Sequence, residues 1–117
     1  MFLRMINLVV CFLHIWNLKI VKGNSIPKIM PFQFLSTVQE GHRQQITCSI
    51  VAGEPPFVFT WRKDGKELSK YIEIKTDDLY SLLIIPSVRT EDIGNYTCLA
   101  SNAIGTDSYT AALKMKE

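Results

Sequence analysis

The cysteines are the residues of this 117-residue chain whose type and spacing allow a defined chemical step, the oxidation of two thiols to a disulfide. Cys11 lies in an apolar N-terminal stretch, whereas Cys48 and Cys98 lie in the remainder of the chain. An even pair of cysteines in an oxidising compartment predicts a disulfide. This bond would close a loop of about 50 residues, which the chain-entropy model equates with about 4 kcal/mol of stabilisation.

The other polar residues give little support to catalysis or metal binding. His42 stands beside Gly41 in an expected turn, with no serine or cysteine partner pattern. Asp77 and Asp78 are adjacent in another expected turn, where aspartate is favoured locally, and no further calcium ligands are arranged around them. The glycines occupy turn positions and form no phosphate-binding pattern. We therefore expect no enzyme, no cofactor, no metal site and no small-molecule substrate.

The segment Asn95-Tyr96-Thr97 matches the acceptor sequence for N-glycosylation. If Tyr96 points inward, the period of two along a strand places Asn95 towards solvent. The sequence therefore predicts a glycosylation site at Asn95.

The first 23 residues have the features of a secretory signal peptide. Arg4 supplies a short positive start, residues 5–15 form an apolar run, and residues 23–25 give a small, polar exit. The alternative is a membrane anchor, but a span of about 20 apolar residues is interrupted by Asn7, His14, Asn17 and Lys19. We assign residues 1–23 to the signal, with cleavage expected between Val21 and Ile26.

Residues 24–117 have the length of one domain. The composition of the chain, 47% hydrophobic and 21% charged, is typical of a globular protein and excludes a disordered one. The net charge of +2 comes from 13 basic and 11 acidic residues without a basic cluster, so we expect no nucleic-acid partner.

Short runs that alternate apolar and polar side chains follow from residue 28 onward, a pattern typical of a β-sandwich or barrel. Turn signals separate them at residues 53–56, 64–65, 77–78 and 102–105. Ile46 and Cys48 share a face of one run, and Tyr96 and Cys98 share a face of another. We therefore predict an all-β fold of two sheets with seven or eight strands, in which the disulfide bridges the sheets.

Residues 28–116 resemble an immunoglobulin domain. The resemblance is carried by Cys48, by Trp61 between the cysteines, and by the motif Asp92-x-Gly94-x-Tyr96-x-Cys98. It implies that Cys48 and Cys98 tie strand B to strand F and that Trp61 packs on their disulfide.

The same resemblance gives roles to the residues around the second cysteine. It implies that the Tyr96 hydroxyl forms a hydrogen bond with the backbone a few residues upstream. It also implies that Gly94 allows the chain to turn sharply into strand F. Asp92 would cap the turn and pair with a base, for which Lys70 and Arg89 are the candidates.

Residues 98–113 resemble the intermediate set (I-set) of these domains, and the lack of a spare run between strands C and D agrees. Residues 31–68 are similar to the variable modules of the arthropod Down syndrome cell adhesion molecule (Dscam) family. The matching stretches are "PFQF", "GEPP" and "WRKDGKEL". In that family such modules pair with identical copies, in antiparallel fashion, through the A-B-E-D sheet.

We expect an apolar stripe on the outer face of that sheet. If Leu83 and Ile85 point into the core, Leu82 and Ile84 point outward from the same strand. The predicted partner-binding residues are Leu82 and Ile84, the small residues Thr47 and Ser49 on strand B, and the charged residues Glu73 and Lys75 that frame them. The alternatives are scattered surface residues or cover by the first strand or a neighbouring domain. A rival interface on the C-F-G sheet would use Leu99, Arg62 and Thr97.

These observations favour an extracellular recognition module for cell–cell adhesion by homophilic binding. One alternative is a soluble or surface immune receptor module that binds foreign ligands. Another is a cytosolic filament-type structural domain, against which the leader argues. No membrane span or lipid-anchor signal follows the last strand. We therefore expect a fragment of a longer membrane protein or a secreted product.

Overall fold

A computed structural model describes residues 25–116 of the chain. The predicted signal peptide, residues 1–23, lies outside the described residues. No helix among residues 25–116 is long and apolar enough to cross a membrane.

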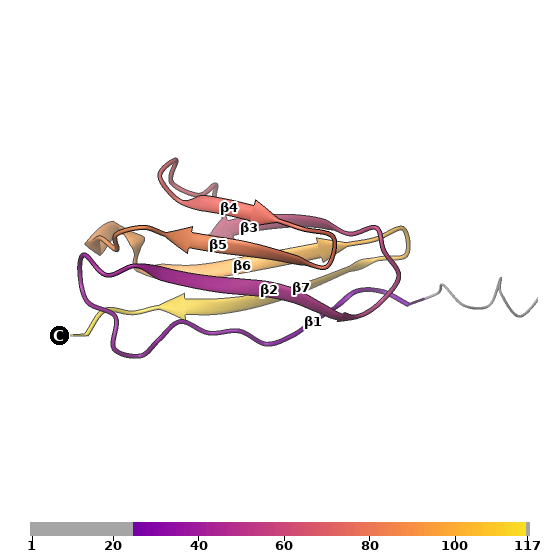
Figure 1. The fold of residues 1–117 in the computed structure, drawn as a ribbon, viewed down its shortest axis with the longest axis horizontal. Helices are drawn as coiled ribbons and strands as arrows, with labels where there is room; N and C mark the ends of the chain where they lie inside the picture. Colours follow the sequence, from indigo (N-terminus) through magenta and orange to yellow (C-terminus); the bar gives the residue numbers. More distant parts are fainter. Residues whose placement is uncertain (1–24, 117) are drawn as a thin grey trace, which may run out of the picture.

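The described chain forms seven strands and one short 3-10 turn (Figure 1). The strands are β1 (Lys28–Ile29), β2 (Gln44–Ala52), β3 (Val58–Lys63), β4 (Glu73–Thr76), β5 (Tyr80–Ile85), β6 (Gly94–Ser101) and β7 (Thr106–Leu113), and the turn is η1 (Thr90–Asp92). They build two sheets, ordered β1-β2-β5-β4 and β3-β6-β7, with antiparallel neighbours throughout. The prediction of an all-β, two-sheet immunoglobulin-like sandwich is confirmed, and the first sheet corresponds to A-B-E-D.

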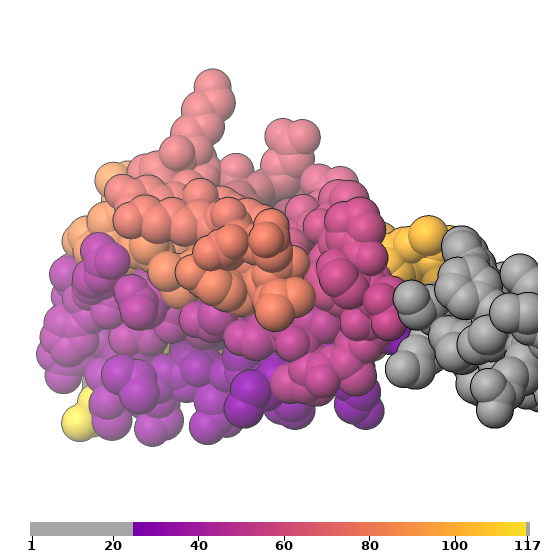
Figure 2. Space-filling view, turned by 45° about the vertical axis from the view of Figure 1, so that its right-hand side comes forward, coloured from indigo at the N-terminus to yellow at the C-terminus, as the bar shows by residue number. Residues whose placement is uncertain are grey.

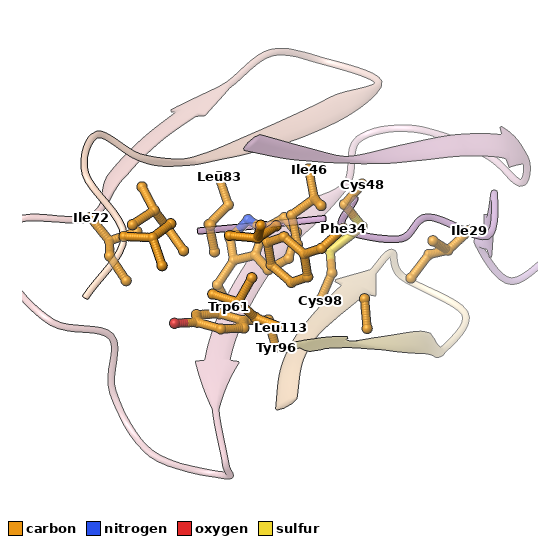
Figure 3. Close-up of a cluster of buried hydrophobic side chains, with 14 of the residues drawn as sticks. Ile29, Phe34, Ile46, Cys48, Trp61, Ile72, Leu83, Tyr96, Cys98 and Leu113 are labelled. Carbon is orange, nitrogen blue, oxygen red and sulfur yellow. A yellow bond between two sulfur atoms is a disulfide. The ribbon is translucent and has the colours of Figure 1, made fainter. Parts of the chain in front are cut away.

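The core lies between the two sheets and follows the predicted alternation. Ile46 of β2 and Leu83 of β5 point inward from one sheet, and Tyr96 of β6 points inward from the other (Figure 3). Cys48 and Cys98 form the predicted disulfide across this core, with a Cα–Cα distance of 6.4 Å. The sheets are therefore joined covalently as well as by packing.

Trp61 lies beside the disulfide in the middle of the core, with 7% of its surface exposed. Its indole Nε1–H donates a hydrogen bond to Ser81 Oγ at 2.9 Å. A buried indole N–H needs such a partner, since an unpaired polar group in an apolar interior is costly. This hydrogen bond links β3 to β5, and so one sheet to the other.

Tyr96 and Asp92 fasten the start of β6 to the turn before it. The Tyr96 hydroxyl donates to the backbone carbonyl of Asp92 at 2.6 Å, as the resemblance implied. The Asp92 carboxylate accepts hydrogen bonds from the backbone N–H of Arg89, at 2.8 Å, and from the Tyr71 hydroxyl. Tyr71 thus occupies the place that we predicted for a basic partner, Lys70 or Arg89. The Arg89 guanidinium instead lies over the Tyr71 ring, 4.4 Å from its centroid.

Gly94 allows the turn between β3 and β4 to approach β6 closely. Its φ is +154°, and a Cβ at this position would lie 2.5 Å from Oδ2 of Asp64. Oδ1 of Asp64 accepts a hydrogen bond from the backbone N–H of Asn95 at 2.9 Å. The glycine therefore leaves room for the side chain that holds the beginning of β6.

Asn102 joins three loops at the other end of the sandwich. Its Nδ2 donates to the carbonyls of Ser25, at 2.9 Å, and Glu54, at 3.1 Å. Its Oδ1 accepts from the backbone N–H groups of Ile104, at 2.9 Å, and Gly105, at 3.1 Å. The first described residues are therefore fixed to the body of the domain.

Candidate protein-binding surface

The outer face of the sheet β1-β2-β5-β4 carries the residues predicted from the sequence to bind a partner. Register and alternation decide which side chains point outward. Thr47 of β2 pairs with Leu82 of β5, and Ser49 pairs with Tyr80. Ile84 pairs with Gln45 on one side and with Glu73 on the other.

The expectation that both Leu82 and Ile84 face water is wrong. Leu82 is half-buried, and Ile84 is buried, with 1% of its surface exposed. Ile84 sits on an inner strand between Gln45 and Glu73, and such cross-strand neighbours lie within about 5.5 Å. Alternation predicts the direction of a side chain, whereas its exposure also depends on the strands on both sides of it, here β2 and β4.

Three other apolar residues are exposed on this face and surround the small Ser49. Their exposed fractions are 55% for Met30, 59% for Val51 and 41% for Tyr80. The Met30 N–H donates to the Ser49 carbonyl at 2.9 Å, Tyr80 pairs with Ser49 from the opposite strand, and Val51 follows on β2. We call Met30, Val51 and Tyr80 the apolar patch.

Two features make the apolar patch hard to predict from the sequence. Met30 follows β1, a two-residue strand with an irregular register. Tyr80 comes directly after the turn signal at Asp77 and Asp78, which obscures its place on the same strand as Leu82. The available signal was the alternation itself, since Val51 and Tyr80 have the same parity as Ser49 and Leu82.

Small and charged residues complete this face. Thr47 is exposed and Ser49 is half-buried, so the surface between the apolar residues is low. Glu73 and Lys75 are exposed on the edge strand β4, paired with Ile84 and Leu82 respectively, and point to the same side. The structure thus brings five of the six predicted residues to the surface of one face, with Ile84 buried beneath it.

A shallow groove of about 810 Å³ adjoins the patch. Two segments line it, namely Pro55, Pro56 and Phe57 from the loop after β2, and Thr76, Asp77, Asp78 and Leu79 from the turn before β5. In Figure 2 the orange surface of β5 lies beside the magenta surface of residues 50–57. Within residues 25–116 no three His, Cys, Asp or Glu side chains gather in a way that could hold a metal ion.

The opposite sheet presents the rival surface. Leu99 and Thr97 are half-buried on the outer face of β6, and Arg62 is exposed on β3. The Thr97 hydroxyl lies 2.7 Å from that of Thr110 on β7, so these hydroxyls pair with each other. This face presents mainly hydroxyl side chains, whereas the other face carries the apolar patch.

The family model described as the immunoglobulin I-set domain matches residues 27–115. The chain belongs to the immunoglobulin I-set family. This I-set domain is 38% identical, over 93 residues, to the cell adhesion molecule Dscam2 of Drosophila melanogaster. The match covers 77% of this chain and 4% of Dscam2, so the I-set domain spans a small part of that relative.

Solved structures give the same assignment. The Ig7 domain of Dscam1, isoform 5, superimposes with a TM-score of 0.75 and 27% identity, over 80% of this chain and 100% of that one. An I-band fragment of titin has a TM-score of 0.68 and 27% identity, over 78% of this chain and 32% of the fragment. The similarity of this I-set domain to the Dscam family is thereby confirmed, and the fold is shared with titin.

Proposed function

We propose that this I-set domain is an extracellular recognition module that mediates cell–cell adhesion by pairing with an identical copy through the outer face of β1-β2-β5-β4. The supporting observation is the apolar patch, in which Met30, Val51 and Tyr80 are exposed around the small Ser49. The similarity to Dscam2, a cell adhesion molecule, supports the same role.

The shape of this face suits contact with a second sheet. Thr47 and Ser49 leave a low surface between larger neighbours, so the backbones of two sheets can approach. Tyr80 offers a large, rigid contact with a polar tip, and tyrosine is enriched in protein interfaces. Burial of the apolar patch supplies the driving force, at roughly 25 cal/mol for each Å² removed from water.

Charge placement supports pairing with an identical copy. A two-fold contact uses the same surface on both partners. Glu73 and Lys75 lie two positions apart on one edge strand, so each can face the opposite charge of an antiparallel copy. A module with a different charge order would bring like charges together, and this mismatch would give specificity.

The size of the face predicts weak binding by one module. The face is small, since its strands β1, β2, β5 and β4 have 2, 9, 6 and 4 residues. Stable interfaces bury about 800 Å² on each partner. We infer that strong adhesion requires many modules acting together in a longer chain at a cell surface.

Sedimentation equilibrium of the purified domain tests the proposal. We expect a reversible dimer for the wild-type domain secreted from animal cells and a monomer for Tyr80→Asp from the same source, because the charge would be buried in the contact. The matched control is Val58→Asp, since Val58 is 68% exposed on the other sheet. A dimer that survives Tyr80→Asp, or that is lost equally in Val58→Asp, would exclude this face.

The second candidate is a filament-type structural domain, and the similarity to titin favours it. The state of Cys48 and Cys98 separates the two, because disulfides are rare in the cytosol. Oxidised cysteines in the native protein support the adhesion module, and free thiols support the filament domain. The third alternative, an immune receptor module, predicts a strict monomer that binds a foreign ligand.

A further inference from the structure

The glycosylation motif at Asn95 lies on the face opposite the apolar patch. Asn95 is the second residue of β6, which is the middle strand of the sheet β3-β6-β7. Tyr96 beside it is fully buried, so alternation directs the exposed Asn95 outward from that sheet. It is the single Asn-x-Ser/Thr sequence of the chain, so any N-linked glycan on the chain must be attached there.

We propose that Asn95 carries an N-linked glycan that covers the outer face of β3-β6-β7 and leaves the module with one adhesive face. The choice of the other face as the adhesive one rests on the proposed function. The attachment of the glycan rests on the motif Asn95-Tyr96-Thr97, and the exposure of Asn95 shows that the folded domain can accommodate it.

The backbone of Asn95 is fixed while its side chain stays free to carry a sugar. Its N–H donates to Asp64 Oδ1 at 2.9 Å, and its carbonyl accepts from the Asp64 N–H at 2.8 Å. Gly94 precedes it without a side chain, and its partner on β7 is the exposed Ala112. These small neighbours leave space above Asn95, so the folded domain accommodates a glycan without displacing packed side chains.

The covalent step takes place before the domain has folded, at the side-chain amide of Asn95. Nδ2 forms a bond to the anomeric carbon of an oligosaccharide carried on a lipid pyrophosphate. The bond from that carbon to the pyrophosphate oxygen breaks, and the lipid pyrophosphate leaves with the electron pair. The amide loses one proton to a base of the transferase. No oxidation or reduction is involved.

The outer face of β3-β6-β7 could itself bind another sheet, so a glycan that covers it would prevent a second contact. The outward residues of these strands are mainly small, uncharged or β-branched, namely Val58, Thr60, Thr97, Leu99, Ser101, Thr106, Ser108, Thr110 and Ala112. Arg62 is the one charged residue directed outward within these three described strands. Hydroxyl pairs lie across it, with 2.7 Å between the oxygens of Thr97 and Thr110. A face with little charge, on which Thr97 pairs with Thr110 and Ser101 pairs with Thr106, is suited to pack on another sheet, and a bulky, hydrated glycan on its middle strand would prevent this.

Mass spectrometry of the domain secreted from animal cells tests the attachment. We expect the wild-type protein to lose mass on treatment with peptide N-glycosidase. Thr97→Ser keeps the motif and a hydroxyl, so it should lose mass too. Asn95→Gln and Thr97→Val should show no such loss. A wild-type domain whose mass is unchanged by the enzyme would overturn the proposal.

Sedimentation tests the covering of the face separately. Tyr80→Asp with the glycan should be monomeric, whereas Tyr80→Asp combined with Asn95→Gln should associate through the uncovered sheet. A monomeric double variant, or a glycosylated Tyr80→Asp that still associates, would contradict the covering role even where the glycan is present. If the wild-type domain is a monomer, the proposed homophilic adhesion is wrong. The mass measurement would still show whether Asn95 carries a glycan.

Discussion

The buried polar side chains of this domain all have partners, which matters because the core is small. Within the described chain, no buried side-chain nitrogen or oxygen lacks a hydrogen bond. Trp61 is paired with Ser81, and Tyr96 with the carbonyl of Asp92. An unpaired buried group costs about 1–3 kcal/mol, so these residues need both their apolar bodies and their polar tips. The tyrosine two residues before the cysteine thus follows from a hydrogen bond that holds the start of β6.

Replacement of Tyr96 by phenylalanine tests the value of that hydrogen bond. Tyr96→Phe keeps the ring and leaves the Asp92 carbonyl without its donor, so we expect the free energy of unfolding to fall by about 1–3 kcal/mol. Urea denaturation at neutral pH measures this change. Tyr80→Phe, at an exposed tyrosine, should change the stability by less than about 0.5 kcal/mol and serves as the control. Equal effects of the two replacements would contradict the assigned role of the Tyr96 hydroxyl.

The two tyrosines near Asp92 also predict the response of the domain to alkaline pH. Burial raises the pKa of Tyr96. The pKa of Tyr71 is raised mainly by burial and, to a smaller extent, by its hydrogen bond to Asp92. Since an unfolded tyrosine has a pKa of about 10, the unfolded chain releases these protons first. Stability from these groups is therefore complete below about pH 10 and is lost as pH rises above it towards the raised pKa values.

Urea denaturation at several pH values from about 8 to about 11 measures this alkaline decline. The double variant Tyr71→Phe/Tyr96→Phe should start from a lower stability and lose less of it over the same interval, because phenylalanine releases no proton. Lysine titration affects both proteins alike. The relevant quantity is therefore the difference between the two proteins in how steeply the free energy of unfolding falls with pH. Parallel slopes would contradict the raised pKa values.

At the scale of elements, the sequence predicts direction better than exposure. Alternation placed Cys48 and Cys98 inward and Thr47 outward, because the period of two is a property of each strand alone. Ile84 lies between Gln45 and Glu73, which come from two other strands, and is nevertheless buried. The exposure of Met30 depends on how β1 joins β2. Such facts follow from the packing of segments distant in sequence, which alternation does not specify.

The position of Ile84 leads to a prediction that differs from its expected role on the surface. Ile84→Asp would place a charge at a buried site, so we expect a loss of more than about 2 kcal/mol of stability. Thr47→Asp, at an exposed position on the same sheet, should change stability by about 0.5 kcal/mol or less. Thermal melts of both variants compare them. A fully stable Ile84→Asp would show that this side chain is accessible.

The whole domain consists of two sheets joined by one disulfide, and the outer faces of these sheets differ in character. The two ends of the described chain lie at opposite ends of the sandwich (Figure 1). One face carries the apolar patch and the other carries hydroxyl pairs and Asn95. The sequence predicted the disulfide and both sheets, because both depend on motifs and alternation, whereas the location of the patch needed the assembled structure.

Removal of the disulfide tests how much the covalent bond contributes. The bond joins residues separated by 50 positions, for which the chain-entropy model gives about 4 kcal/mol. We expect Cys48→Ala/Cys98→Ala to lose stability of this order in urea denaturation. For a small domain this is a large share of a total of about 5–15 kcal/mol. A loss below about 1 kcal/mol would show that packing alone holds the sheets together.

Nuclear magnetic resonance of the labelled domain at increasing protein concentration tests self-recognition through the outer face of β1-β2-β5-β4. We expect the backbone amide signals to shift along β2 and β5, around Thr47, Ser49 and Tyr80, while those around Thr60 and Ser108 on the other sheet stay constant. Shifts confined to β3, β6 and β7, or spectra that do not change at any concentration, would contradict self-recognition through this face.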